Sequence, residues 1–194
     1  MSNSIITEDC EKALIVRLVR AEIRNPISVA VLEELYGIVD SLAGKPVIFT
    51  GQDNVFASGA NLREISGITA ENAREFAVFG QNLMSKISEL RQTTIAAING
   101  YCFGGALDLA LACDMRVALP GATFSHPGAG LGIITGWGGT QRLPRLIGRA
   151  KALEMFFTTT PVTAVEALRI GLIDTMADDL ISESLANLPP SYSS

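Results

Sequence analysis

Residues 96 to 118 read Ala96-Ala-Ile-Asn-Gly-Tyr-Cys-Phe-Gly-Gly-Ala-Leu-Asp-Leu-Ala-Leu-Ala-Cys-Asp-Met-Arg-Val-Ala118, and this stretch is the most informative in the chain. Residues 94–99 form a short β-rich run that Gly100 ends, and 104–113 are apolar nearly all round, which is typical of a buried helix. The N–H groups at the start of such a helix, backed by its dipole, favour a negatively charged or strongly polar ligand. The stretch therefore predicts a strand, a candidate anion site and a buried helix in that order.

Asp108 is the one charged residue in this apolar helix, and it lies one turn beyond Gly105. An unsatisfied buried charge costs several kcal/mol, on the order of the penalty for a buried polar group. Two interpretations stay open at this point: Asp108 stabilises its own helix or pairs with an arginine, or it is a functional acid or base.

Outward from this stretch, strands and amphipathic helices alternate, which predicts an α/β fold with largely parallel strand pairing. We expect one domain over 1–194 with a frayed tail at 188–194, which holds two prolines and three serines. The expected strands are 13–19, 46–50, 94–99, 115–118 and 123–125, and the expected helices are 28–42, 69–90, 104–113, 150–157 and 163–170, the last closed by Gly171.

The composition narrows the class of protein. The chain has 194 residues, 48% of them hydrophobic, a net charge of −5 and a pI near 4.9, which argues against nucleic acid or an anionic membrane as the main partner. Its three cysteines form no paired motif, the N-terminus lacks a secretory pattern and the apolar runs are too short for a membrane span, so we expect a cytoplasmic protein. With one histidine, no metal site is expected.

The glycine clusters match no nucleotide-binding or hydrolase motif. The chain contains no GxGxxG, no GxxxxGK[ST] and no GxSxG. For the cluster from Gly128 to Gly139, tight turns and close helix–strand packing are the favoured interpretation.

Four motifs in order resemble those of the crotonase (enoyl-CoA hydratase/isomerase) superfamily. The stretch 96–118 is similar to its central signature, and Val55-Phe-Ala-Ser-Gly-Ala-Asn-Leu-Arg-Glu64 to its earlier loop. Residues 131–148 and 164–174 resemble two later blocks, so the resemblance covers roughly 12–178. It implies a crotonase-like spiral of ββα units that binds an acyl-CoA.

The resemblance also implies roles for residues. The N–H groups of Ala60 and Gly105 form an oxyanion hole that stabilises a thioester enolate, with Asp108 as acid or base. Ser58 and Arg63 would contact CoA, which is the substrate, so neither a metal nor a separate cofactor is expected. Arg24 is a candidate phosphate partner; for both arginines the alternative is a solvated surface position.

This chain departs from the family's usual pattern in its carboxylates. Gly128 stands where the second glutamate of hydratases follows a proline, and Gly136 where other members place an acid. Asn61 replaces a usual aspartate. His126 is a candidate substitute, since positions two apart in an extended segment share a face.

The chain also stops early relative to the family, so we expect the helical C-terminal part to be shortened and a trimer-based homo-oligomer to be weakened. The leading hypothesis is an enoyl-CoA hydratase- or isomerase-like enzyme of fatty acid metabolism, a lyase or isomerase. The alternatives are a catalytically impaired acyl-CoA-binding or assembly module, and a thioester or C–C hydrolase with His126 as its base.

Overall fold

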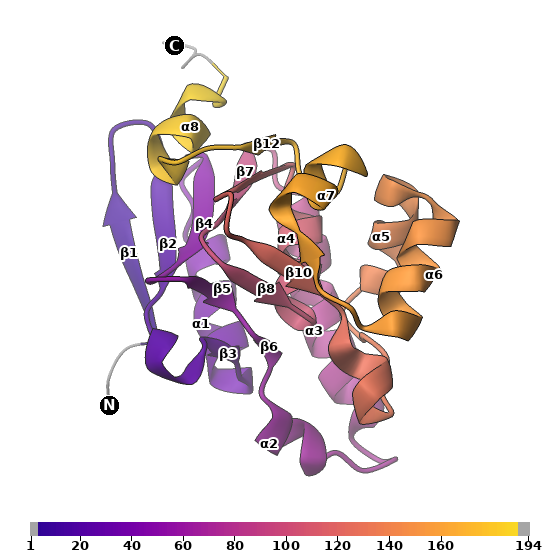
Figure 1. Ribbon diagram of the computed structural model, residues 1–194. Helices are drawn as coiled ribbons and strands as arrows, with labels where there is room; N and C mark the ends of the chain where they lie inside the picture. The colour runs from indigo at the N-terminus through magenta and orange to yellow at the C-terminus, as the bar shows by residue number, and fades with distance from the viewer. Residues whose placement is uncertain (1–3, 190–194) are drawn as a thin grey trace.

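A six-stranded sheet forms the centre of the molecule (Figure 1) in a computed structural model that describes residues 4–189. Its strands are parallel except for the antiparallel pair β1–β2. In sheet order they are β1 (Ile5–Asp9), β2 (Leu14–Leu18), β4 (Val47–Gly51), β7 (Thr94–Ile98), β9 (Met115–Ala118) and β12 (Thr175–Met176).

A second sheet of four short strands lies beside the first one. Its order is β11 (Val162–Thr163), β10 (Thr123–Ser125), β8 (Tyr101–Phe103) and β5 (Val55–Ala57), and a separate pair joins β3 (Pro26–Ile27) to β6 (Gly59–Ala60). The chain passes from β4 to β5, from β7 to β8 and from β9 to β10, and each time continues into helical structure. This repeated strand–strand–helix path confirms the predicted spiral of ββα units.

The helices follow the sheets. They are α1 (Val29–Asp40), α2 (Leu62–Ser66), α3 (Ala73–Ser88), α4 (Gly105–Ala112), α5 (Gly139–Ile147), α6 (Arg149–Thr158), α7 (Ala164–Arg169) and α8 (Leu180–Ala186), with 3₁₀ turns η1 (Ala21–Ile23) and η2 (Pro127–Leu131). Every residue of α4 is buried, as its apolar composition predicts. Because α4 is surrounded by other elements, its N-terminus and Asp108 have a fixed position inside the molecule.

Alternation along the strands divides the core in two. In β4, Val47 and Phe49 belong to the main core that holds α1, α3 and α4, whereas Ile48 belongs to a second cluster that α8 covers. Successive side chains of a strand point to opposite faces of a sheet, so both faces are buried. Burial of both faces explains why strands such as β4 and β7 consist of consecutive buried residues.

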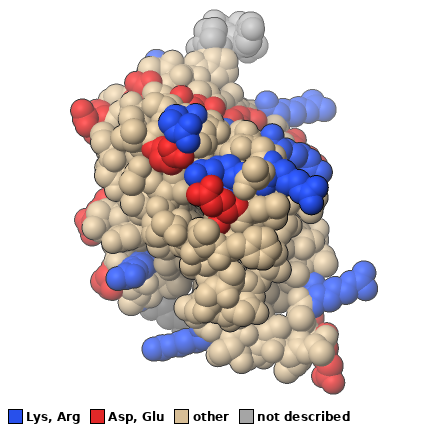
Figure 2. All heavy atoms as spheres, turned by 45° about the vertical axis from the view of Figure 1, so that its right-hand side comes forward, with Lys and Arg blue, Asp and Glu red and all other residues tan. Residues whose placement is uncertain are grey.

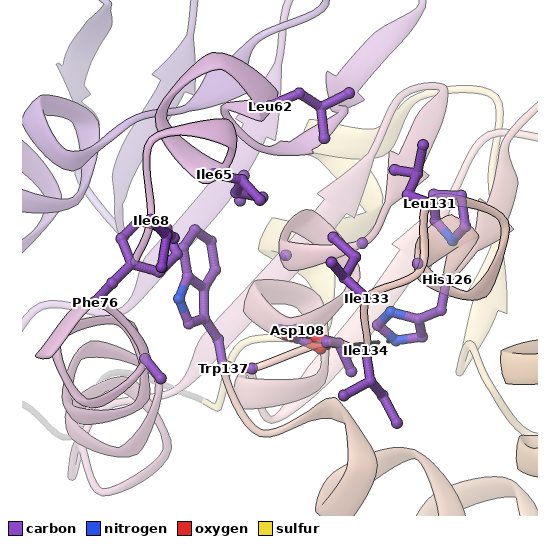
Figure 3. A pocket seen from close by; sticks show the side chains of 18 of the residues that line it. Leu62, Ile65, Ile68, Phe76, Asp108, His126, Leu131, Ile133, Ile134 and Trp137 are labelled. Carbon is purple, nitrogen blue, oxygen red and sulfur yellow. Dashed lines mark hydrogen bonds and ion pairs between the residues drawn. The ribbon is translucent and has the colours of Figure 1, made fainter. Parts of the chain in front are cut away.

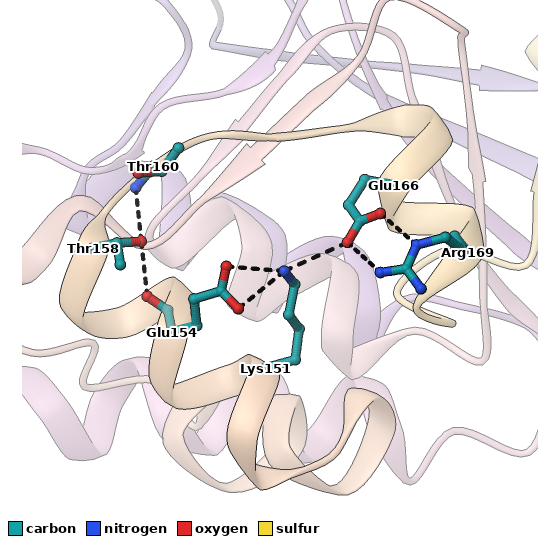
Figure 4. A network of polar contacts seen from close by, with 6 residues as sticks. All are labelled: Lys151, Glu154, Thr158, Thr160, Glu166 and Arg169. Carbon is teal, nitrogen blue, oxygen red and sulfur yellow. Dashed lines mark hydrogen bonds and ion pairs between the residues drawn. The ribbon is translucent and has the colours of Figure 1, made fainter.

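Charged side chains link α6 to α7 at the surface (Figure 4). The Nζ of Lys151 lies 3.0 Å from the Glu154 carboxylate on α6 and 3.4 Å from that of Glu166 on α7. Arg169 donates two hydrogen bonds to Glu166 as well. These pairs are exposed, so we expect them to orient the two helices more than to stabilise the fold.

The structure differs from the sequence analysis or adds to it at three places. Residues 5–9, for which no strand was predicted, form the edge strand β1, in which Ile5 is buried while the next four residues are exposed. The cluster from Gly128 to Gly139 contains the predicted turns, and helix α5, which was not predicted, begins at its end after Gly138 adopts a φ of 109°. Leu188, placed in a frayed tail, packs against the α8 cluster, and residues 190–194 of that tail lie outside the described part.

None of the helices within residues 4–189 combines the length and the hydrophobicity that crossing a bilayer requires.

Candidate active site

A cavity of about 380 Å³ lies between α2, α3, the start of α4 and the segment 126–137 (Figure 3). We call it the central cavity. Its polar wall is formed by Asp108, His126 and the backbone around Gly105. Its other walls are apolar, and their larger side chains are Leu62, Ile65, Ile68, Phe76, Leu131, Ile133, Ile134 and Trp137. Apolar walls with a few converging polar groups are typical of a small-molecule site.

Two backbone N–H groups lie side by side at this cavity. A Cβ atom added to Gly105 would be 3.3 Å from the Ala60 nitrogen, and one added to Gly59 would be 2.9 Å from the Gly105 nitrogen. Gly105 is in the first turn of α4, where an N–H has no acceptor within the helix. Asn61 donates to the Ile27 carbonyl, so the N–H of Ala60 points to the other side of β6.

Glycine is required where these segments meet. Gly59 has a φ of 92°, and a Cβ atom there would also lie 2.6 Å from the Phe103 carbonyl oxygen. Gly104 has a φ of 55°, in the left-handed region that disfavours larger residues. The structure thus brings Ala60 and Gly105 together, as the motifs imply for a pair of hydrogen-bond donors.

Trp137 forms one wall of the central cavity, and sequence reasoning did not single it out. Its ring is buried between two glycines, because a Cβ atom would come within 2.2 Å of it at Gly80 and within 2.4 Å at Gly105. Phe76 of α3 lies next to it, with ring centroids 5.8 Å apart. The only sequence signal that Trp137 forms a cavity wall was its position beside glycines at the start of a helix.

Asp108 reaches the cavity from α4 and is fully buried. Its Oδ2 accepts a hydrogen bond from the Thr135 hydroxyl, whereas its Oδ1 has no hydrogen-bond partner among the described residues. Burial raises the pKa of Asp108 from 3.8 to about 7, against the opposing effects of Thr135, Arg142 and nearby backbone N–H groups. Near neutral pH the carboxyl group therefore exchanges a proton readily.

His126 approaches Asp108 from the end of β10. Its Nε2 is 3.6 Å from the Oδ1 of Asp108, and the side chain is 3% exposed. Both ring nitrogens lack a hydrogen-bond partner within residues 4–189. Burial lowers the pKa of His126 from 6.5 to about 4, so the imidazole is neutral over most of the physiological range.

The reason given for placing His126 near position 128 was wrong, although both residues line the central cavity. The residues after His126 form the 3₁₀ turn η2, and the extended segment that the argument assumed is absent there. His126 reaches the cavity because its ring packs against Phe156 of α6, with centroids 5.0 Å apart.

Residues 10–187 match the family model described as enoyl-CoA hydratase/isomerase. The chain belongs to that family.

Several relatives in this family are similar over most of the chain. It is 38% identical to the crotonyl-CoA hydratase of Syntrophomonas wolfei over 88% of this chain and 68% of that one. It is 41% identical to the putative enoyl-CoA hydratase/isomerase YngF of Bacillus subtilis over 90% and 69% of the two chains. The crystal structure of an enoyl-CoA hydratase from Bacillus anthracis superimposes with a TM-score of 0.88 at 35% identity, covering 95% of this chain and 74% of that one.

The family's expected CoA contacts are only partly at the central cavity. Ser58 lines it, but its N–H donates to the Arg24 carbonyl at 2.9 Å and is not free for a ligand. Arg63 and Arg24 are exposed and lie outside the lining, with the Arg24 guanidinium 5.7 Å from the centre of the Tyr101 ring. Both arginines stay candidates for a part of CoA outside the cavity.

The positions of the missing family carboxylates differ in the space around them. Gly128 and Gly136 both line the cavity. A Cβ atom at Gly128 would lie 2.7 Å from the Ile133 carbonyl oxygen, whereas at Gly136 the nearest atom is a methyl carbon of Ala77 at 3.9 Å. Asn61, which replaces a usual aspartate, caps α2 by accepting from the N–H of Arg63.

Within residues 4–189, no group of three or more His, Cys, Asp or Glu side chains is arranged to hold a metal ion.

Proposed function

We propose that the chain binds an acyl-CoA with the thioester oxygen between the N–H groups of Ala60 and Gly105, and acts on it through a thioester enolate. The observation that carries this proposal is the pair of adjacent N–H groups at a cavity into which a buried acid, Asp108, also points. Each donor of this kind is worth about 2.7–4 kcal/mol of transition-state stabilisation in comparable sites. The relatives named as crotonyl-CoA and enoyl-CoA hydratases support the substrate class.

Asp108 is the proposed acid/base group of this chemistry. It lies one helical turn beyond Gly105, so a substrate held by the two N–H groups would have its α-carbon near this carboxyl group. With a pKa of about 7, it can give a proton to an enolate or take one from a thioester near neutral pH. The expected reaction is that of a lyase or an isomerase acting on the α and β carbons of the acyl chain.

The acyl chain would occupy the apolar part of the central cavity. Phe76, Trp137 and Ile65 line this part, and its volume of about 380 Å³ suits a short to medium acyl group. The nucleotide part of CoA would lie outside, where Arg63 and Arg24 are the candidate phosphate partners. CoA is the substrate in this proposal, and no further cofactor takes part.

A binding module that has lost catalysis is the second candidate. It is favoured by glycine at both 128 and 136, where family enzymes carry acids. Such a protein would keep its affinity for acyl-CoA without turnover, so binding and reaction have to be measured separately.

We further propose that the chain self-associates. Four apolar side chains on α6 and α7 are at least 39% exposed: Leu153, Phe157, Val165 and Leu168. Figure 2 shows this side of the molecule, where acidic and basic side chains gather in the upper part and much of the remaining surface is uncharged. Exposed apolar area of this kind favours association between copies.

The cysteines bear on the proposed location. Cys10, Cys102 and Cys113 form no disulfide with one another. Reduced thiols are typical of a cytoplasmic protein, and a cytoplasmic enzyme of acyl-CoA metabolism is our proposal.

The test combines calorimetry with hydrogen exchange. We expect butyryl-CoA to bind the wild-type chain and to exchange its α-hydrogens with D₂O at pH 8, where Asp108 is ionised. Asp108→Asn should keep the affinity and lose the exchange by about 10²–10⁴-fold. Undetectable binding at millimolar butyryl-CoA contradicts the proposal, and binding without exchange supports the binding module instead.

A further inference from the structure

We propose that His126 is the second acid/base group of this site and that it works with Asp108 as a dyad to add water to an enoyl thioester. This inference rests on the proposed function, since it assumes that the thioester lies between Ala60 and Gly105. In this proposal His126, which directly follows β10, takes the part of the second carboxylate that is absent at Gly128.

The first support is the hydrogen-bonding state of the two side chains. Oδ1 of Asp108 and both ring nitrogens of His126 are buried at the cavity without a partner among the described residues. Buried polar atoms are satisfied in the great majority of cases, and an unsatisfied one costs about 1–3 kcal/mol. Three such atoms on two facing side chains indicate a site for a ligand that both donates and accepts hydrogen bonds, as water does.

The second support is the space made for the pair. A Cβ atom at Gly139 would lie 2.1 Å from Oδ1 of Asp108 and 3.1 Å from Cε1 of His126. Only glycine at the first position of α5 leaves room for both side chains in their present positions. Figure 3 shows them pointing toward one another, with Ile133 and Ile134 nearby.

Third, the groups around Asp108 and those around His126 differ in their effect on protonation. The Thr135 hydroxyl, the N–H groups of Trp137 and Gly139, and the more distant Arg142 cation all act on Asp108 and favour its ionised form. The Cys102 thiol is also close enough to interact with Asp108. His126 faces Asp108 and the Phe156 ring, and burial keeps the imidazole neutral and able to accept a proton.

The proposed step balances without any co-reactant except water. A ring nitrogen of His126 takes a proton from water, and the water oxygen bonds to the β-carbon of the enoyl thioester. The π electrons move toward the thioester oxygen, held by the N–H groups of Ala60 and Gly105. The α-carbon then takes the proton of Asp108, and the imidazolium returns its proton to Asp108 across the 3.6 Å contact.

Hydration of crotonyl-CoA by His126→Gln tests the dyad. We expect the rate constant to fall by about 10²–10⁴-fold while the affinity for butyryl-CoA stays within about twofold of wild type. Ser125→Ala is the matched control, because Ser125 is a buried neighbour that bonds the Thr159 carbonyl outside the cavity. Hydration by His126→Gln at the wild-type rate overturns the inference.

The pH dependence of the wild-type chain provides a test that needs no variant. The dyad requires neutral His126 and protonated Asp108, so kcat/KM for hydration should fall as pH rises through about 7. A rate that instead rises through this range would make ionised Asp108 the base that activates water, and would overturn the role of His126.

The two proposals fail in different ways. Absent α-hydrogen exchange of butyryl-CoA by the wild-type chain contradicts the enolate function itself. Normal exchange together with undetectable hydration of crotonyl-CoA contradicts only the dyad.

Discussion

Asp108 and His126 illustrate how burial at a single residue acts on stability as well as on chemistry. The folded chain holds an extra proton on Asp108 between pH 3.8 and about 7, so this residue makes the fold less stable as pH rises. The folded chain lacks a proton on His126 between about pH 4 and 6.5, so this residue makes the fold less stable as pH falls. Between about pH 4 and 6.5 the two effects oppose one another and nearly cancel.

Single substitutions should therefore expose opposite slopes. Asp108→Asn removes the titration of Asp108, so relative to wild type its free energy of unfolding should rise with pH from about 3.8 to 7, with a slope equivalent to about one proton. His126→Gln removes the titration of His126, so relative to wild type its free energy of unfolding should fall with pH from about 4 to 6.5. Urea denaturation at half-unit pH steps measures both, and parallel curves for the two variants would show that the pair does not titrate as described.

The two missing carboxylates should not be equally easy to restore. In Gly128→Glu the new carboxylate should raise the rate of hydration. The added Cβ atom would press on the Ile133 carbonyl oxygen, however, so we expect the variant to lose about 1–3 kcal/mol of stability. Gly136→Glu meets only Ala77 at ordinary contact distance and should fold as well as wild type. Thermal unfolding and crotonyl-CoA hydration of both variants decide this; an equally stable Gly128→Glu would show that the 133–134 backbone moves easily.

At the scale of elements, the packing of α3 and α4 on Trp137 positions one wall of the central cavity. Gly80 of α3 and Gly105 of α4 each leave space that the indole ring fills. The packing of Trp137 between these glycines holds the N–H of Gly105 at a fixed distance from α3, although β7 and β8 separate the two helices in the sequence.

Gly80→Ala should loosen this packing. Its Cβ would overlap the indole ring, and we expect a loss of about 1–3 kcal/mol in stability together with weaker binding of butyryl-CoA. Gly37→Ala is the control, because Gly37 is an exposed residue in α1 with nothing within 4 Å of an added Cβ. It should stabilise the chain by about 0.5–1 kcal/mol, since alanine favours a helix. Equal effects of the two substitutions on binding would contradict the role given to Trp137.

At the scale of the whole molecule, the exposed side chains of α6 and α7 bear on assembly. Phe157 is 75% exposed and Val165 is 65% exposed. Phe157→Asp should shift sedimentation at micromolar concentration toward the monomer, because a charge in an apolar contact is desolvated on association. An unchanged distribution would place any interface elsewhere, and Glu11→Gln, on an exposed turn, is the matched control.

Much of this molecule follows from the sequence alone. Periodicity and apolar runs located α1, α3, α4 and the central-sheet strands β2, β4, β7 and β9 within a few residues, because burial of a face leaves a regular apolar pattern in a sequence. The edge strands β1 and β12 were not predicted. The completely apolar composition of α4 indicated its burial, and Asp108 stood out as the one charge within it. Two of the four motifs, 55–64 and 96–118, implied Ala60 and Gly105 through their resemblance to the family.

Other features were decided only by the tertiary structure. The approach of His126 to Asp108, the position of Trp137 between two glycines and the different space at Gly128 and Gly136 all depend on contacts between segments distant in sequence. Periodicity carries no information about such contacts, and irregular segments such as η2 have no period at all. The pKa values of Asp108 and His126 depend on desolvation in the folded state, which no local sequence pattern can specify.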